Sequence, residues 1–159
     1  MKGSNWKAVA VIRDATVEDI PKLLHLMRQL AVFEGYADRF RITEEALLER
    51  GFAPDRAPEF SAILGVIDNV PVGYAVTYTI PFTFDLRPTV VLKELFVESH
   101  CRNTGMGSTL MTAVIERARS MNARLLRWQV LPCNDNAKMF YTKFGGDKDR
   151  EWDEWVMEL

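Results

Sequence analysis

The sequence predicts a single α/β domain in which helices pack on a largely antiparallel sheet. The chain has 159 residues, about the length of one average domain, and 48% of them are hydrophobic and 26% charged, as in globular proteins. Strand-like and helix-like segments follow one another in the order β-α-α-β-β-β-α-β-α-β, which is neither a regular βα alternation nor all-β. No repeat, low-complexity tract or long linker divides the chain, so we expect one domain over residues 1–159.

The N-terminal half is predicted to contain one strand, two helices and a β-hairpin. Thr16, with Asp19 three residues later, has the pattern of a capping box, which marks a helix start. Apolar residues then recur at helical spacing as far as Ala31. Asp68 and Asn69 separate two β-rich segments and are typical turn residues. We expect a strand at residues 8–13, a helix from Ile20 to Gly35, a helix from Thr43 to Gly51, and hairpin strands at 60–67 and 71–80.

The C-terminal half is predicted to alternate between strands and helices. Its last residues include the apolar side chains of Trp152, Trp155, Val156 and Met157, which favour a buried terminal strand. Such a strand either completes the sheet of one chain or lies at a subunit interface. We expect strands at 89–97, 123–131 and 151–159, and helices at 107–121 and 135–144.

Charge and composition exclude several classes of protein. Twenty basic residues against 22 acidic ones give a net charge of -2, which argues against binding to nucleic acid or to an anionic membrane. No stretch approaches the roughly 20 uninterrupted apolar residues of a membrane span. Cys101 and Cys133 show neither the spacing of a metal site nor that of a disulfide framework, so no metal is expected. The N-terminus lacks the apolar run of a signal peptide, so a cytoplasmic protein is expected.

The segment 95–108 has the pattern of an anion site. A strand runs into the turn Arg102-x-x-Gly105-x-Gly107, and this turn opens an amphipathic helix. Free backbone N–H groups, a helix N-terminus and one Arg side chain thus share a small volume, and all of them favour a phosphate. The segment lacks the Gly-Lys-Ser/Thr of a Walker loop and the third glycine of a dinucleotide fingerprint. Taken alone, a G-x-G at a helix start is more often a simple turn.

A second motif makes the first one specific. Residues 134–145 read N-x-x-A-x-x-F-Y-x-x-x-G, about 30 residues after R-x-x-G-x-G. Together the two motifs resemble the GNAT superfamily of acetyl-CoA-dependent N-acetyltransferases, and the resemblance extends over essentially the whole chain. Four further segments resemble the spermidine/spermine (diamine) N-acetyltransferase branch. These are residues 30–34, 47–52, 82–85 and 92–97.

The resemblance implies a site for acetyl-CoA. Backbone amides at the helix start would hold the pyrophosphate, and the backbone of Leu95 and Val97 would pair with the pantetheine arm. Asn134 would contact the same arm, or it would serve as the N-cap of the next helix, and the two roles are compatible. The expected cofactor-binding residues are Leu95, Phe96, Val97, Arg102, Asn103, Thr104, Gly105, Met106, Gly107, Ser108 and Asn134.

Two residues are candidates for the chemistry. Tyr141 would give a proton to the thiolate that leaves acetyl-CoA; the alternative is a core aromatic beside Phe140 and Phe144. Glu94 would accept the proton of the substrate ammonium; the alternative is a solvated or ion-paired carboxylate on a strand. Strand alternation places Glu94, Phe96 and Glu98 on one face. We expect Glu34, Asp85 and Glu94 to bind the acceptor.

The sequence departs from the diamine branch at two positions. Asn103 stands where the branch has Gly, and phosphate binding survives because Asn tolerates unusual backbone angles. Lys93 stands where the branch has an acidic residue, and its charge, with that of Arg87, would repel a polyamine. These charges favour a smaller amine or an amino acid that carries its own carboxylate. The resemblance implies a polyamine, a diamine or an amino-acid-like amine, and these classes stay open.

Other functions stay open at this point. The chain would acetylate a small-molecule amine, a protein lysine or a protein N-terminus, or it would bind CoA for regulation without transferring anything. The resemblance also implies a homodimer.

Overall fold

A computed structural model describes residues 10–159 as two compact units. The first unit ends at Trp128, and the second spans Gln129–Leu159. Residues 8 and 9 of the predicted first strand lie outside the described residues.

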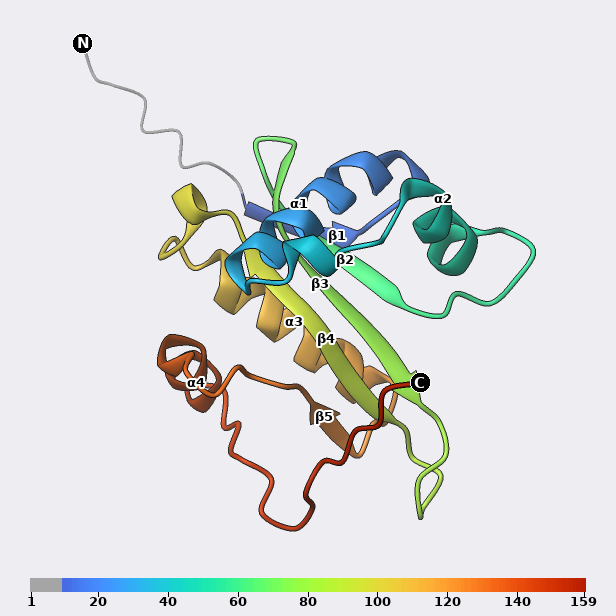
Figure 1. Cartoon of the computed structure of the whole chain (residues 1–159), viewed down its shortest axis with the longest axis vertical. Coiled ribbons are helices and arrows are strands. Elements are labelled where there is room, and N and C mark those ends of the chain that lie inside the picture. The colour runs from blue at the N-terminus through green and yellow to red at the C-terminus, as the bar shows by residue number, and fades with distance from the viewer. Residues whose placement is uncertain (1–9) are drawn as a thin grey trace. The chain divides into compact units, whose positions relative to one another are not determined.

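The first unit contains a five-stranded sheet with its strands in sequence order (Figure 1). Neighbouring strands run antiparallel except β4 and β5, which are parallel. The predicted fold class, a mixed and largely antiparallel sheet with helices, is therefore confirmed. The strand predicted at residues 123–131 is much shorter in the structure. The strands are β1 (Ala10–Asp14), β2 (Ser61–Ile67), β3 (Val70–Ile80), β4 (Thr89–Val97) and β5 (Leu125–Arg127).

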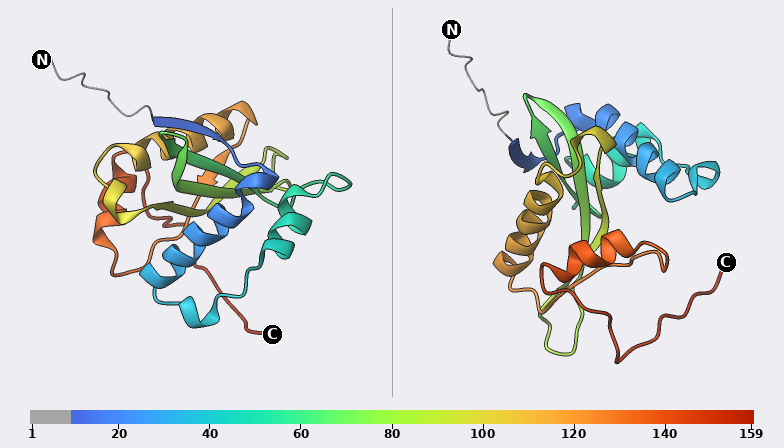
Figure 2. Two further views of the ribbon diagram at one scale, coloured as in Figure 1. Left: turned by 90° about the horizontal axis from the view of Figure 1, so that it is seen from above. Right: turned by 90° about the vertical axis from the view of Figure 1, so that its left-hand side faces the viewer.

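Helices cover both faces of this sheet (Figure 2). Helix α1 (Ile20–Phe33) packs its buried leucines on one face, together with Tyr74 and Phe96 of the sheet. Helix α3 (Met106–Ser120) packs on the other face. It lies close because Gly65 has no side chain: a Cβ there would be 2.3 Å from the Met106 sulfur. A short helix, α2 (Glu44–Leu47), continues into a π-helical turn at Leu48–Phe52.

The local signals of the sequence are found where they were expected. The Asp19 carboxylate accepts a hydrogen bond from the Thr16 backbone N–H at 2.8 Å, as in a capping box. Thr43 caps α2, because its hydroxyl accepts the N–H of Ala46 at 3.2 Å. Asp68 and Asn69 both have positive φ, 49° and 65°, as a tight hairpin turn requires.

The second unit contains one helix, α4 (Asp135–Thr142), and the predicted terminal strand is wrong. No residue from 152 to 159 has regular secondary structure, and Trp155 and Val156 are 91% and 90% exposed. A strand needs the hydrogen bonds of a neighbouring strand, and the residues of this unit form no other strand. The apolar side chains of this segment are therefore uncovered.

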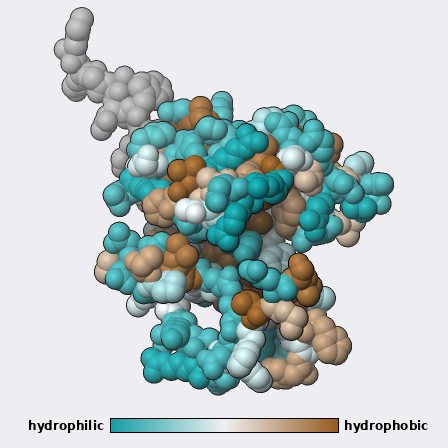
Figure 3. Space-filling model, viewed as in Figure 1, coloured by the Kyte–Doolittle hydropathy of each residue, from teal (hydrophilic) through white to brown (hydrophobic). Residues whose placement is uncertain are grey.

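No helix within residues 10–159 is both long enough and apolar enough to cross a membrane. The face of the molecule drawn in Figure 3 is mainly hydrophilic, with apolar residues in small separate groups.

Candidate active site

A β-bulge in β4 sets the geometry of the first unit's candidate site. Glu94 pairs with Val76 of β3 and Leu92 pairs with Thr77, so Lys93 is an extra residue without a partner of its own. Paired residues of antiparallel strands project to the same face. After the bulge, Glu94 therefore shares a face with Phe96, which lies in the core under α1. The predicted common face of Glu94, Phe96 and Glu98 is confirmed.

Beyond the first three residues of β4, one edge of this strand has no strand partner. β5 pairs only with Thr89–Val91, and no other strand of the described chain pairs there. The predicted pantetheine-binding residues Leu95 and Val97 lie in this unpaired stretch. Backbone N–H and C=O groups on an open edge can pair with an extended amide-containing ligand. The Val97 carbonyl also accepts a hydrogen bond from Arg102 Nε at 2.9 Å.

The loop after β4 presents backbone donors at the start of α3. Asn103 and Gly105 adopt left-handed conformations, with φ of 61° and 92°, which confirms that Asn103 tolerates the unusual angle. Gly105 is the N-cap and provides no side-chain acceptor. Within the described chain, the N–H groups of Met106, Gly107 and Ser108 have no hydrogen-bond acceptor, and the first N–H to find one is that of Thr109. These donors, with the positive end of the helix dipole, fit a pyrophosphate.

Two predicted cofactor-binding residues can take part only through their backbone. The side chains of Phe96 and Met106 are 5% and 2% exposed and lie in the core.

Two side chains of the loop after β4 hold it in place. The Thr104 hydroxyl donates a hydrogen bond to the Cys101 carbonyl at 2.7 Å. The Arg102 guanidinium lies over the rings of Phe33 and Phe96, at 4.7 and 5.4 Å from their centroids. It thereby connects the loop to the C-terminal end of α1.

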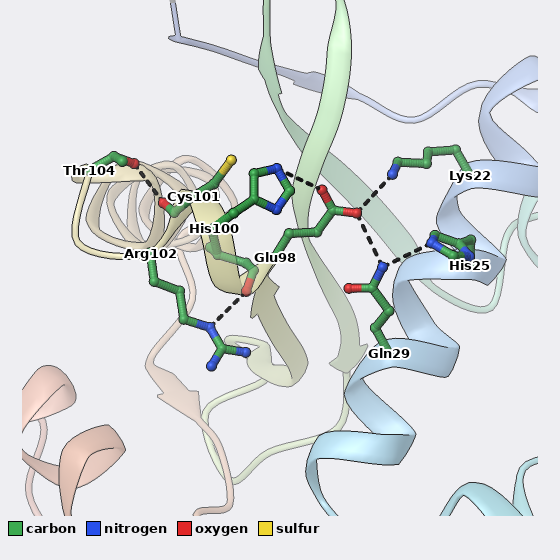
Figure 4. A network of polar contacts seen from close by, with 9 residues as sticks. Lys22, His25, Gln29, Glu98, His100, Cys101, Arg102 and Thr104 are labelled. Atoms are coloured by element: carbon green, nitrogen blue, oxygen red, sulfur yellow. Dashed lines mark hydrogen bonds and ion pairs between the residues drawn. The ribbon is translucent and has the colours of Figure 1, made fainter.

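A buried carboxylate anchors the start of this loop to α1 (Figure 4). Glu98 is only 7% exposed, and its Oε1 accepts hydrogen bonds from Lys22 at 2.9 Å and from Gln29 at 3.2 Å. Its Oε2 lies 3.6 Å from the His100 ring. Burial alone would raise the pKa of Glu98, but these partners lower it below the ordinary value. Sequence analysis missed this anchor, since the partners are 69 and 76 residues away.

Glu98→Gln is expected to reduce the free energy of unfolding by about 1–2 kcal/mol at pH 7, because the Lys22 ammonium loses its anion. The folded-state pKa of Glu98 is depressed, so this stabilisation is present above the unfolded pKa and disappears as the pH falls through the folded value. Urea denaturation at several pH values measures it. Glu116→Gln, at an exposed position on α3, is the matched control. Equal stabilities of wild type and Glu98→Gln at pH 7 would contradict the assignment.

A second group of polar residues surrounds Glu94. Its carboxylate accepts a hydrogen bond from the Tyr74 hydroxyl at 2.9 Å. Burial raises the pKa of Glu94; Tyr74 and Lys93 oppose this shift, and the nearby Glu34 adds to it. Burial also raises the pKa of Glu34, and Lys93 opposes it. Burial and the two carboxylates raise the pKa of Tyr36 to about 12. The charges of the exposed Glu34 and the half-buried Glu94 thus interact, and this acidic pair suits a cationic ligand.

Asp85 does not join this acidic pair. Its carboxylate accepts hydrogen bonds from the Thr83 hydroxyl and the Arg87 backbone N–H, both at 3.1 Å, and lies 3.5 Å from Arg124. The Arg87 guanidinium donates hydrogen bonds to the backbone carbonyls of Asn122 and Ala123. Both residues therefore connect the β3–β4 loop to the segment after α3. The Arg87 guanidinium is already occupied by these hydrogen bonds.

The two motif residues of the second unit lie on α4. Asn134 is its N-cap, because its side-chain oxygen accepts the Ala137 N–H at 3.1 Å. The capping alternative is thus confirmed, and a contact with the pantetheine arm stays a prediction. Tyr141 is half-buried, with its ring 5.1 Å from that of Phe140 in an edge-on contact. Asn134 and Tyr141 are seven residues apart, two helical turns, so they share one side of α4.

An open strand edge, a loop that ends in free backbone donors, and two interacting carboxylates, the half-buried Glu94 and the exposed Glu34, fit a group-transfer enzyme with a phosphate-bearing co-substrate. The particular family follows from comparison: the chain belongs to the Acetyltransferase (GNAT) family, whose model matches residues 24–146. The predicted superfamily is thereby confirmed, and the protein is an acetyltransferase. Enzymes of this family use acetyl-CoA.

Curated relatives and solved structures agree with this assignment. The chain is 30% identical over 156 residues to thialysine N-epsilon-acetyltransferase of Bos taurus, covering 93% of this chain and 90% of the relative. It is 24% identical over 184 residues to an L-ornithine N5-acetyltransferase of Arabidopsis thaliana, covering 89% and 81%. An aminoglycoside acetyltransferase from an uncultured soil metagenomic sample matches with a TM-score of 0.78 at 17% identity, over 94% and 96% of the two chains. This last likeness supports the fold.

Proposed function

We propose that this acetyltransferase moves the acetyl group of acetyl-CoA to a primary amine of a small molecule, by direct attack of the amine in a ternary complex. The observation that carries the proposal is the pair Glu34 and Glu94: Glu94 lies on β4 in the stretch whose outer edge has no strand partner in the described chain, the charge of Glu34 at the end of α1 acts on it, and burial raises the pKa of both. Such a pair attracts an ammonium group and can take its proton. The named activities of the relatives, on thialysine and ornithine, point to the same class of acceptor.

The cofactor-binding role belongs to two backbone surfaces. The N–H groups of Met106, Gly107 and Ser108 would hold the pyrophosphate, with Asn103 and Gly105 supplying the left-handed turns that expose them. The backbone of Leu95 and Val97 would pair with the pantetheine amides, and Asn134 would add a contact from α4. When bound, acetyl-CoA supplies the thioester whose acetyl group is transferred.

Glu94 and Tyr141 would divide the proton transfers. Glu94 takes the proton that the substrate ammonium must lose before its nitrogen can attack, directly or through water. Tyr141 gives its proton to the departing thiolate, or hydrogen-bonds to it. Glu34 holds a cationic part of the acceptor. Asp85 stays a further candidate for acceptor binding.

An acceptor screen tests the function. We expect CoA thiol release from acetyl-CoA with at least one class among polyamines, diamines, diamino acids and aminoglycosides, and mass spectrometry should show an N-acetylated product. A panel that also includes a lysine peptide separates small-molecule from protein acetylation. Tight acetyl-CoA binding with no thiol release from any acceptor would instead indicate a regulatory module.

The proposal includes a homodimer, with the terminal segment at the subunit junction. Residues 152–159 leave apolar side chains uncovered, and a second copy would supply the missing cover. Sedimentation velocity at micromolar concentration is expected to give twice the chain mass, and Trp155→Ser with Val156→Ser to shift it toward the monomer. A monomer mass for the wild type would reject the dimer.

A further inference from the structure

Lys93 places a cation at the acceptor site that the fold does not use for its own contacts. It is the extra residue of the β4 bulge, directly before Glu94, and its side chain is exposed. Between residues 10 and 159, no hydrogen bond and no ion pair within 4.0 Å involves its ammonium. A bulge commonly redirects a side chain next to a functional site. The ammonium is therefore available to pair with a ligand.

Charges of both signs interact around the bulge. The Lys93 ammonium acts on both carboxylates of the pair, because it opposes the burial that raises the pKa of Glu34 and of Glu94. Two carboxylates and one ammonium that acts on both complement a ligand that carries two ammonium groups and one carboxylate. A diamine offers only the two ammonium groups, so Lys93 would repel it and find no counter-charge.

We propose that Lys93 binds the carboxylate of a diamino acid acceptor and thereby selects diamino acids over the corresponding diamines. Glu94 then faces the amine to be acetylated, and Glu34 holds the other ammonium group. The inference rests on the proposed function and adds to it a specificity-determining residue. Arg87 does not compete for this role, since its side chain is tied to the carbonyls of Asn122 and Ala123.

Two acceptors that differ only in a carboxylate make the test sharp. L-ornithine and 1,4-diaminobutane form such a pair, and L-lysine and 1,5-diaminopentane form a second. We expect the wild type to have the higher kcat/KM for the amino acid in each pair. Lys93→Met should lower this preference about tenfold, the scale of one charge-assisted hydrogen bond, and Lys93→Glu should reverse it. The control Arg119→Gln removes one exposed positive charge on α3, at the opposite face of the sheet, and should leave the ratio unchanged.

Binding measurements separate this inference from the proposed function. Calorimetric titration of the CoA-loaded protein with L-ornithine and with 1,4-diaminobutane reports the preference without turnover. A binding preference for ornithine that disappears in Lys93→Met supports the inference, whether or not any acceptor releases thiol. The absence of thiol release from every acceptor would overturn only the proposed function. Equal affinities of the wild type for the two ligands, or a preference that Lys93→Met retains in full, would overturn the inference while acetylation itself stands.

Discussion

Tyr141→Phe is expected to lower kcat by about 10²–10⁴-fold, the range typical for loss of a general acid or base. The change removes one hydroxyl and keeps the ring, so the edge-on packing with Phe140 at 5.1 Å should persist. Affinity for acetyl-CoA should change little, because the proposed pyrophosphate and pantetheine contacts use the backbone of other residues. Single-turnover kinetics with a saturating acceptor measures the chemical step directly.

Phe144→Leu provides the matched control for the packing role of this aromatic group. The rings of Phe140 and Phe144 are 5.2 Å apart, so shortening Phe144 disturbs the group and leaves the Tyr141 hydroxyl in place. This variant should lose stability while keeping most of its kcat. If Tyr141 were only a packing residue, the two variants would behave alike. Near-normal single-turnover rates in Tyr141→Phe would remove Tyr141 from the mechanism.

Features governed by local sequence could be predicted. The turn at Asp68-Asn69, the left-handed Asn103 and the helix that begins after Gly105 depend on residues that are neighbours in the chain. Turn-forming residues and amphipathic periodicity in the sequence predict such features. The loop between β4 and α3, which we propose to bind the pyrophosphate, belongs to this group. So does Asn134, whose role as an N-cap depends on the helix that follows it.

Features governed by strand register and tertiary packing could not be predicted. The bulge at Lys93 depends on how β4 aligns with β3, and a regular alternation of side chains gives no sign of it. The anchor of Glu98 depends on a helix more than 60 residues earlier. The terminal segment has the composition of a strand, but a strand also needs a neighbour, which its own unit does not provide.

The pH dependence of the reaction is expected to separate the two interpretations of Glu94. A base must be deprotonated to work, and burial raises the pKa of Glu94 above its ordinary value. The rate should therefore be low at pH values below this elevated pKa and should rise as the pH increases through it. Glu94→Gln should lose about 10²–10⁴-fold in kcat/KM near neutral pH. It should recover part of that loss at high pH, where more of the acceptor amine, with a pKa of about 10, is already neutral.

Tyr74→Phe is the companion variant, because it leaves Glu94 in place and changes only its environment. The Tyr74 hydroxyl donates to the Glu94 carboxylate at 2.9 Å and stabilises its charged form. Without this hydrogen bond the pKa of Glu94 should rise further, so the acidic limb of the pH profile should move to higher pH. If Glu94 only bridges β3 and β4, both substitutions would lower the stability of the sheet and leave the position of this limb where it was. A wild-type limb that persists unchanged in Glu94→Gln would assign the proton transfer to another group.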